Sequence, residues 1–177
     1  MDRSASRPVL VLMGVSGCGK STVAGVLAGR LGWDLAEGDD MHPRANVEKM
    51  AAGHALRDSD RWPWLDRVAA WIADHTAAAR PGIVTCSALK RRYRDVLRGE
   101  RVVFVYLAGT RKQIADRLAV RHGHFMPPTL LDSQFADLEP PDPDELSITV
   151  DIGGSPDGEA SEIIRRLGLE PTLGRSP

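Results

Sequence analysis

The stretch VLVLMGVSGCGKS, residues 9–21, decides the fold class of this chain. Its first part, Val9 to Met13, is wholly apolar, which is typical of a strand buried on both faces of a parallel sheet. The remainder matches the pattern G-x-x-x-x-G-K-[ST] and leads into an amphipathic helix over about residues 20–30, which Gly32 ends. A strand, a glycine-rich turn and a helix in this order predict a loop that binds phosphate groups.

The chemistry of this loop lies in its backbone and in two side chains. Glycines allow several backbone N–H groups to point inward, and the helix N-terminus adds the positive end of its dipole. Lys20 is placed to reach the β- and γ-phosphates, and the Ser21 hydroxyl is placed to bind Mg²⁺. We therefore expect ATP and Mg²⁺ as cofactors, with Ser21 as the metal ligand. The predicted nucleotide-binding residues are Gly14, Val15, Ser16, Gly17, Cys18, Gly19, Lys20, Ser21 and Thr22.

The rest of the chain continues to alternate between strand and helix patterns. Further strands are expected at 33–36, 82–86, 102–107 and 147–150. Helices are expected over 43–50, from Asp60–Pro63 onward, from a Ser87 cap to about residue 98, after Thr110, and from Ser155–Pro156 to Gly168. This alternation predicts an α/β layer fold with a mainly parallel sheet.

Composition narrows the class of protein. The 177 residues fit one domain, and a formal net charge of −1 does not favour nucleic acid or an anionic membrane as a partner. The two cysteines, Cys18 and Cys86, form no CxxC or Cys/His cluster, which fits a reducing, cytoplasmic location. Cys18 is either a small side chain tolerated in the loop or a thiol whose pKa the dipole and Lys20 lower.

A phosphate-binding loop alone does not define the activity. No N-K-x-D string precedes Cys86-Ser87-Ala88-Leu89-Lys90, and the strand 82–86 lacks a terminal aspartate, so a GTPase and an ATPase motor are both disfavoured. The segment after the second strand, residues 37–42, carries acids that can serve the site instead. Asp39 is either a base that accepts the proton of an attacking hydroxyl or an ordinary loop acid or helix cap.

Together these strings resemble the gluconate kinase (gluconokinase) family over nearly the whole chain. The matching strings are GVSGCGKST (14–22), GDDMHP (38–43), NVEKM (46–50), DSDRWPWL (58–65), CSALK (86–90), YRD with LR (93–98), RHGHFM (121–126) and QF with LE (134–139). The shikimate and nucleoside-monophosphate kinases share the general layout. The resemblance implies a P-loop three-layer α/β/α fold with a five-stranded parallel sheet, in one domain over 1–177 with a helical lid at about 121–134.

The resemblance also implies roles for individual residues. Asp39 looks like the substrate-facing catalytic base, and Lys20, Arg117 and Arg121 look like the other catalytic residues. The two arginines are one helical turn apart, so both can face a triphosphate. The residues that resemble the substrate-binding set are Asp39, His42, Lys49, Arg61, Ser87, Lys90, Arg94 and His124. Glu37 stands where the family commonly has aspartate, which leaves its contact with magnesium open.

The implied reaction moves the γ-phosphate of ATP to the 6-hydroxyl of D-gluconate and yields 6-phosphogluconate and ADP. By analogy, the adenine is expected near the lid helix and the turn 153–156, and a homodimer is expected. Shikimate, another sugar acid or a nucleotide remain alternative acceptors. A nucleotide-dependent regulatory module without an acceptor is the alternative from another class.

Overall fold

The computed structural model describes residues 7–120 and 128–172 and contains a five-stranded sheet in the order β2-β3-β1-β4-β5. Each pair of neighbouring strands is parallel. This confirms the α/β class and the mainly parallel sheet predicted from the alternating pattern. The strands are β1 (Val9–Met13), β2 (Asp34–Glu37), β3 (Gly82–Thr85), β4 (Val102–Ala108) and β5 (Ser147–Asp151).

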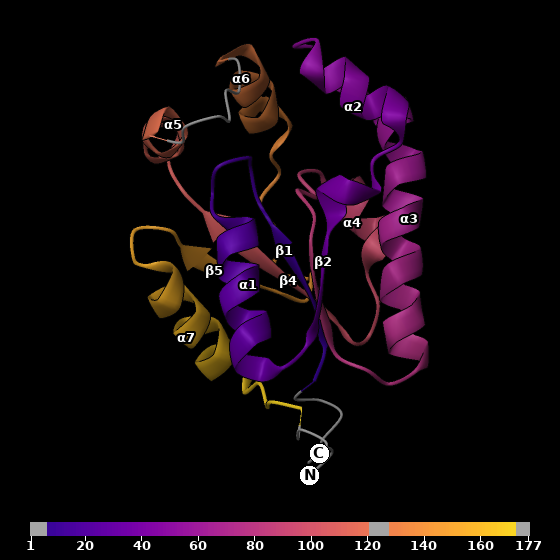
Figure 1. Cartoon of the computed structure of the whole chain (residues 1–177), viewed down its shortest axis with the longest axis vertical. Coiled ribbons are helices and arrows are strands. Elements are labelled where there is room, and N and C mark those ends of the chain that lie inside the picture. The colour runs from indigo at the N-terminus through magenta and orange to yellow at the C-terminus, as the bar shows by residue number, and fades with distance from the viewer. Residues whose placement is uncertain (1–6, 121–127, 173–177) are drawn as a thin grey trace.

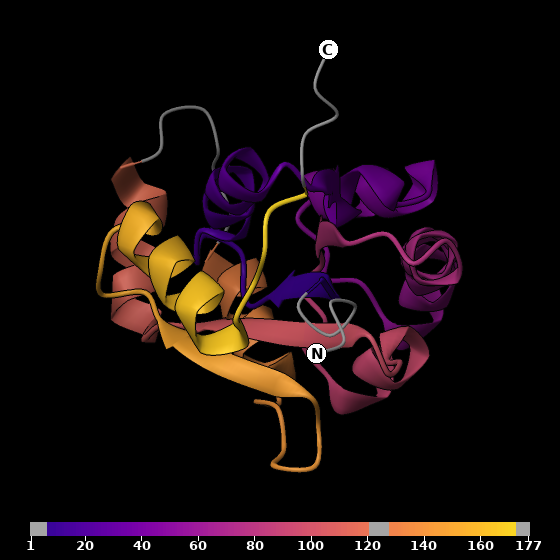
Figure 2. The same cartoon turned by 90° about the horizontal axis from the view of Figure 1, so that it is seen from below.

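Helices cover both faces of the sheet (Figure 1). Helices α1 and α7 lie on one face and α3 and α4 on the other, while α5 and α6 stand beyond the end of the sheet where the strands finish; Figure 2 shows the opposed layers from below. The helices are α1 (Lys20–Leu31), α2 (Arg44–Ala51), α3 (Asp58–Ala77), α4 (Arg91–Leu97), α5 (Arg111–Val120), α6 (Pro128–Asp137) and α7 (Pro156–Leu167), with a 3₁₀ turn η1 (Gly38–Met41).

Strand β1 lies at the centre and supplies both halves of the core. Leu10 and Leu12 point into the cluster shared with α1 and α7, whereas Val9, Val11 and Met13 point into the cluster shared with α3 and α4. Successive side chains of a strand face opposite sides, so a strand covered on both faces must be apolar at every position. The run Val9–Met13 is buried throughout for this reason.

Two helix starts differ from the sequence-based expectation. Helix α4 begins at Arg91, not after Ser87, because Ala88 adopts a positive φ of 43° and the chain turns once more before the helix. Helix α3 begins at Asp58, ahead of the expected Asp60–Pro63 start. There the carboxylate of Asp60 accepts the Arg57 N–H at 2.7 Å, which satisfies a donor at the helix N-terminus.

Helix α6 overlaps the second half of the helical lid expected at about 121–134 and continues beyond it to Asp137. The first residues of that range, 121–127, lie outside the described ones. Leu131 of α6 is buried in the cluster with α1 and α7, and Phe135 packs against the same cluster. The helix is therefore anchored to the body of the protein by apolar contacts.

The ends of β2 and β3 approach each other closely at Gly38. A Cβ atom at this position would lie 2.0 Å from the carbonyl oxygen of Thr85, a distance that no side chain tolerates. The Gly38 carbonyl oxygen accepts the indole N–H of Trp64 at 2.7 Å. Glycine here lets η1 turn directly over the end of β3, which brings the acidic segment after β2 to the edge where ligands bind in such sheets.

Arg94, one of the residues expected to bind substrate, is an internal anchor in this structure. Its side chain is 1% exposed and forms a two-pronged ion pair with Glu145, with N–O distances of 2.6 and 3.1 Å. Its remaining nitrogen donates to the carbonyl oxygens of Ala88 and Leu89. All of its donor nitrogens are engaged, so the geometry argues for a structural role that ties α4 to the segment before β5.

Replacing Arg94 with methionine is expected to lower the free energy of unfolding by about 3–5 kcal/mol, because Glu145 is left buried without its partner. Burial opposes ionisation of Glu145, but the Arg94 hydrogen bonds hold its pKa below the ordinary value. The contribution is therefore present at neutral pH and is lost as the pH falls through the folded-state pKa.

Denaturant titrations of Arg94→Met at pH 7 and at pH 4 measure this, with the exposed Arg98→Met as a control expected to change stability by less than about 0.5 kcal/mol. A stable Arg94→Met variant that binds substrate poorly would return Arg94 to the substrate-binding set.

Candidate active site

The glycine-rich turn lies between β1 and α1 at the edge where the strands end. Gly14 adopts a φ of 143°, and a Cβ atom there would lie 2.7 Å from the Cys18 sulfur and 3.0 Å from the Leu107 carbonyl oxygen. Helix α1 begins at Lys20, directly after the turn, so its free N–H groups and its dipole face the loop. The predicted phosphate cradle therefore has the backbone form that its chemistry requires.

Lys20 lies over the glycine-rich turn, and Cys18 lies beneath it. The Lys20 ammonium donates to the carbonyl oxygens of Gly14 and Val15 at 2.9 and 3.1 Å, so it lies folded over the loop. Cys18 is fully buried beneath it. A thiol without exposure does not react readily with oxidants, so the geometry favours the interpretation of Cys18 as a small side chain that the loop tolerates.

Ser21 contacts Glu37, the carboxylate whose contact with magnesium the sequence analysis left open. The Ser21 hydroxyl donates to Glu37 Oε2 at 2.9 Å, and the same oxygen accepts the Thr85 hydroxyl at 2.5 Å. Glu37 ends β2 and Thr85 ends β3, so two neighbouring strand ends place these oxygens beside the loop. The sequence signals for this contact were the position of Glu37 after the second strand and its match to a family aspartate.

These oxygen atoms suit a small, hard cation. Mg²⁺ prefers oxygen ligands, keeps several waters and commonly takes only one or two protein groups plus phosphate oxygens. Ser21 and Glu37 match that donor set. In the described part of the chain, no cluster of three or more His, Cys, Asp or Glu side chains could form an all-protein metal cage.

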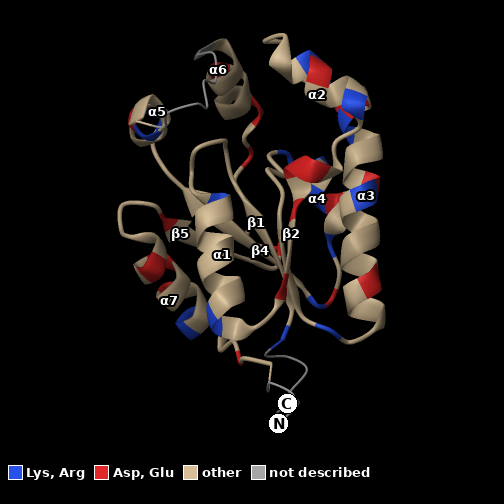
Figure 3. Ribbon diagram, in the orientation of Figure 1, with Lys and Arg blue, Asp and Glu red and all other residues tan. Residues whose placement is uncertain are grey.

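Asp39 lies on η1 and His42 directly follows it, after the end of β2. Figure 3 shows acidic residues in red at this end of β2. Asp39 is exposed, whereas the His42 ring stacks on Trp64 with 4.1 Å between ring centroids. Burial lowers the pKa of His42, although the charge of Asp39 opposes this, and the charge of Arg61 lowers it further. His42 is therefore a neutral imidazole at neutral pH, able to donate or accept a hydrogen bond.

The turn η1 and the phosphate loop both contact the residues that follow β3. A Cβ atom at Gly38, next to Asp39, would lie 3.4 Å from the Cys86 Cα atom, and the Gly14 N–H donates to the Ser87 carbonyl oxygen at 3.2 Å. Burial raises the pKa of the Cys86 thiol to about 12, and the charge of Asp39 raises it while that of Lys20 lowers it. The phosphate loop and the turn that carries the expected base therefore lie at one corner of the sheet edge, as phosphoryl transfer to a hydroxyl requires.

A second group of charges lies on α3, α4 and α6, and we call it the Arg61–Lys90 cluster. Arg61 and Lys90 are 11% and 17% exposed, and each pairs with Asp137 and Asp58. The Tyr93 hydroxyl accepts from Arg61 at 2.5 Å and donates to Asp58. The cluster consists of Arg61, Lys90, Tyr93, Asp58 and Asp137.

The remaining expected site residues lie outside the Arg61–Lys90 cluster or outside the described part of the chain. Lys49 pairs with Asp60 at 2.7 Å, at the junction of α2 and α3. Ser87 is half-buried, and its carbonyl oxygen accepts the Gly14 N–H at 3.2 Å, so it contacts the phosphate loop through its backbone. Arg121 and His124 lie outside the described residues.

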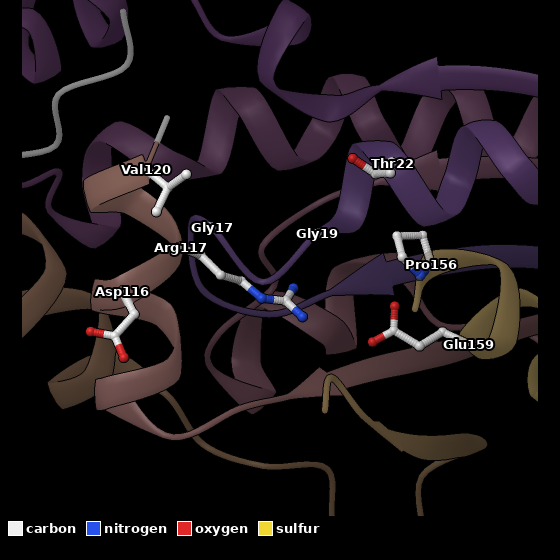
Figure 4. A pocket seen from close by; sticks show the side chains of 8 residues that line it. All are labelled: Gly17, Gly19, Thr22, Asp116, Arg117, Val120, Pro156 and Glu159. Atoms are coloured by element: carbon white, nitrogen blue, oxygen red, sulfur yellow. The ribbon is translucent and has the colours of Figure 1, made fainter. Parts of the chain in front are cut away.

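A pocket of about 460 Å³ opens on the other side of the phosphate loop (Figure 4). Arg117 crosses it and donates to the carbonyl oxygens of Cys18 and Ile152. Its guanidinium faces Pro156 and Glu159 across the pocket, not the interior of the phosphate loop (Figure 4). The lining residues are Gly17, Gly19, Thr22, Asp116, Arg117, Val120, Pro156 and Glu159.

Glu159 is a pocket residue that the sequence analysis missed. It is 4% exposed, and its Oε1 atom has no hydrogen-bond partner within the described ranges 7–120 and 128–172. Burial raises the pKa of this carboxyl, and the charge of Arg117 partly opposes the rise. A ligand with a hydrogen-bond donor would satisfy this oxygen. The sequence shows Glu159 only as an acid in the first turn of a helix, which is a common feature.

Gln134 on α6 is a second contact that the sequence did not reveal. Its Oε1 atom accepts the Ser16 N–H at 2.7 Å, and its Nε2 atom donates to the Ser16 hydroxyl at 3.0 Å. The two bonds tie α6 to the phosphate loop.

Among the residues that the structure describes, no helix is long and apolar enough to cross a membrane.

Comparison with known proteins agrees with this geometry. A family model described as an AAA domain matches residues 9–141. The gluconokinase of Gluconobacter oxydans is 50% identical over 163 residues, which cover 91% of this chain and 92% of that protein.

Two solved structures share both sequence and fold with the chain. A gluconokinase from Sinorhizobium meliloti is 40% identical, with a TM-score of 0.83 over 92% of this chain and 94% of that one. An unliganded sugar kinase from Janibacter is 42% identical, with a TM-score of 0.88 over 93% of this chain and 96% of that one.

Proposed function

The chain belongs to the gluconokinase family of P-loop kinases and phosphorylates gluconate with ATP, and we propose how its residues share that reaction. The observation that carries the proposal is the hydrogen bond from Ser21 to Glu37, because it joins the phosphate loop to the strand end that leads directly into the turn with Asp39. The acceptor is D-gluconate, its 6-hydroxyl is the attacking group, and the products are 6-phosphogluconate and ADP.

The nucleotide binds along the phosphate loop. The backbone N–H groups of residues 14–22 and the Lys20 ammonium bind the phosphates, which requires Lys20 to leave its bonds to Gly14 and Val15. The adenine ring lies in the pocket between Arg117 and Pro156, where a guanidinium can pack on an aromatic ring. Arg117 is therefore proposed to contact the adenine instead of the triphosphate. Arg121 remains the residue proposed to neutralise charge on the transferred phosphoryl group.

Ser21 and Glu37 hold the magnesium ion of the nucleotide complex. Ser21 supplies its hydroxyl, and Glu37 binds the ion or orients one of its waters. When bound, the ion neutralises charge on the phosphate oxygens and orients them. Thr85 donates to Glu37 and so keeps the carboxylate directed at the loop.

The acceptor binds on the side of η1, α3 and α4. Asp39 orients the 6-hydroxyl and accepts its proton as the new bond to phosphorus forms. His42, held neutral by burial, offers a hydrogen bond to a hydroxyl of gluconate. Lys49, Arg61 and Lys90 are proposed for the carboxylate and the other hydroxyls, and Ser87 completes this wall.

Further features rest mainly on the family resemblance. A lid at about 121–134, with His124 in it, closes over the site and excludes water, which suppresses hydrolysis of ATP. A homodimer is proposed on the same ground. A single kinase domain is proposed from the resemblance together with the chain length, and a cytoplasmic location from the use of cysteine. The partner that the reaction itself requires is a small molecule.

A coupled assay of ADP release across D-gluconate, shikimate, other sugar acids and nucleoside monophosphates tests the function. Only D-gluconate is expected to give a high kcat/KM, because the acceptor wall combines cations for a carboxylate with hydroxyl partners. Nucleotide binding without turnover on any acceptor would instead support a regulatory module, and turnover of another acid would redefine the substrate.

Replacing Asp39 with asparagine is expected to lower kcat by about 10²–10⁴, because the amide cannot accept the proton. The dissociation constant of ATP should stay within about twofold of the unchanged protein, since Asp39 lies on the acceptor side. Asp40→Asn, an exposed neighbour on the same 3₁₀ turn, is the matched control and should retain activity. Normal turnover by Asp39→Asn would leave Asp39 as an ordinary loop acid.

Replacing Glu37 with glutamine is expected to raise the magnesium concentration that gives half-maximal activity by about tenfold or more, because a supporting carboxylate is lost. The measurement is activity against free Mg²⁺ at a fixed, saturating concentration of ATP. Glu48→Gln, an exposed α2 variant that removes only the contact with Arg44, should leave the magnesium dependence unchanged. An unaltered dependence in Glu37→Gln would limit Glu37 to a role in structure.

A further inference from the structure

Helix α6 carries two polar side chains, one turn apart, that reach the two halves of the active site. Gln134 contacts Ser16 of the phosphate loop, and Asp137 contacts Arg61 and Lys90 of the acceptor wall. Residues three apart lie on the same face of a helix, so both contacts come from one surface of α6. A displacement of this surface would affect both substrates.

Asp137 has one cation for each of its carboxylate oxygens. Its Oδ2 atom lies 3.1 Å from the Arg61 guanidinium, and its Oδ1 atom lies 3.7 Å from the Lys90 ammonium. Its side chain is 25% exposed, and those of the two cations are less exposed still. A carboxylate held between two shielded cations is the arrangement that a bound sugar acid would itself adopt there.

Shared donor groups show why Asp137 and a sugar acid compete. Arg61 and Lys90 each pair with Asp58 and Asp137, and the more exposed Arg92 also pairs with Asp58. A substrate carboxylate that contacts Arg61 and Lys90 needs the donor nitrogens that these two acids occupy. One of the two protein carboxylates must therefore give way.

Asp58 is the more firmly held of the two acids. A hydrogen bond from Tyr93 lowers the pKa of Asp58 despite the opposing effect of burial, and Lys90 and Arg92 add to the lowering. Arg92 pairs with its second oxygen at 2.6 Å. Within the described ranges Asp137 has ion pairs with Arg61 and Lys90 alone, and the longer of them is 3.7 Å. The backbone beyond it is held, because the Glu139 N–H donates to the Leu89 carbonyl oxygen at 2.7 Å, so the side chain of Asp137 is the part that can move.

We propose that Asp137 is an internal counter-ion that occupies the place of the substrate carboxylate and is exchanged for it when gluconate binds. This rests on the proposed function, because it takes the cations of the acceptor wall as the carboxylate site. The exchange sets the affinity for the acid, and it keeps Arg61 and Lys90 paired while the acceptor is absent. Asp137 is thus a specificity-determining residue that acts by competition.

Calorimetric titration of the full chain with D-gluconate, in the absence of nucleotide, tests the competition. Asp137→Asn is expected to bind gluconate about tenfold more tightly, because a like charge is removed from the site. D-glucitol, a neutral analogue with a hydroxyl group in place of the carboxylate, should bind both proteins equally. Asp132→Asn, which removes an exposed acid of the same helix that pairs with Arg111, is the matched control and should bind gluconate as before.

Equal or weaker gluconate binding by Asp137→Asn overturns the inference. If the unchanged protein still turns over gluconate, the proposed function stands without it. Thermal unfolding of each variant checks that the fold is intact, and Asp137→Ser supplies a second neutral replacement that must show the same tightening.

Discussion

The structure depends on one backbone constraint, the tight turn that joins a fully buried strand to the N-terminus of α1. Glycine at position 14 is required because any side chain would collide with Cys18 and with the carbonyl oxygen of Leu107 on β4. The turn is therefore packed against the sheet as well as curled for phosphate. This packing places the free N–H groups of α1 at the central strand, where the ends of β3 and β4 lie on either side.

The neighbouring strand ends complete the site through short polar contacts. Thr85 on β3 holds Glu37 on β2, and Glu37 in turn bonds Ser21 at the start of α1. Gly38 allows η1 to cross directly over β3, so Asp39 follows at the edge of the sheet where the phosphate loop also lies. Glu37 is proposed for the metal and Asp39 for the acceptor, so two acids close together in the sequence would take different tasks.

The cations of the proposed acceptor wall are paired with carboxylates of the protein itself. Shielded cations such as Arg61 and Lys90 would be costly without partners, and Asp58 and Asp137 supply them. The same requirement explains Arg94, whose position near the acceptor wall suggested a ligand. It satisfies Glu145 and two carbonyl oxygens instead, and so supports the wall from behind.

The sequence by itself determined the parts of the protein whose signals are local. The apolar run Val9–Met13, the glycine-rich turn, and the serine cap and glycine end of α7 each report on their own backbone, and each is found where the pattern placed it. The family resemblance extended this to the reaction, because its strings agree in order and spacing along the chain.

Only the tertiary structure decided which polar side chains meet. Gln134 reaches Ser16, 118 residues away in sequence, and Arg94 meets Glu145 across 51 residues. Hydrophobic periodicity predicts whether a position is buried, but it does not predict which polar side chain forms a hydrogen bond with a loop far away in the sequence. Asp137 and Glu159 therefore looked like ordinary acids in the sequence, and the resemblance left the contacts of Glu37 open, because these contacts arise from packing between elements and not from their own neighbours.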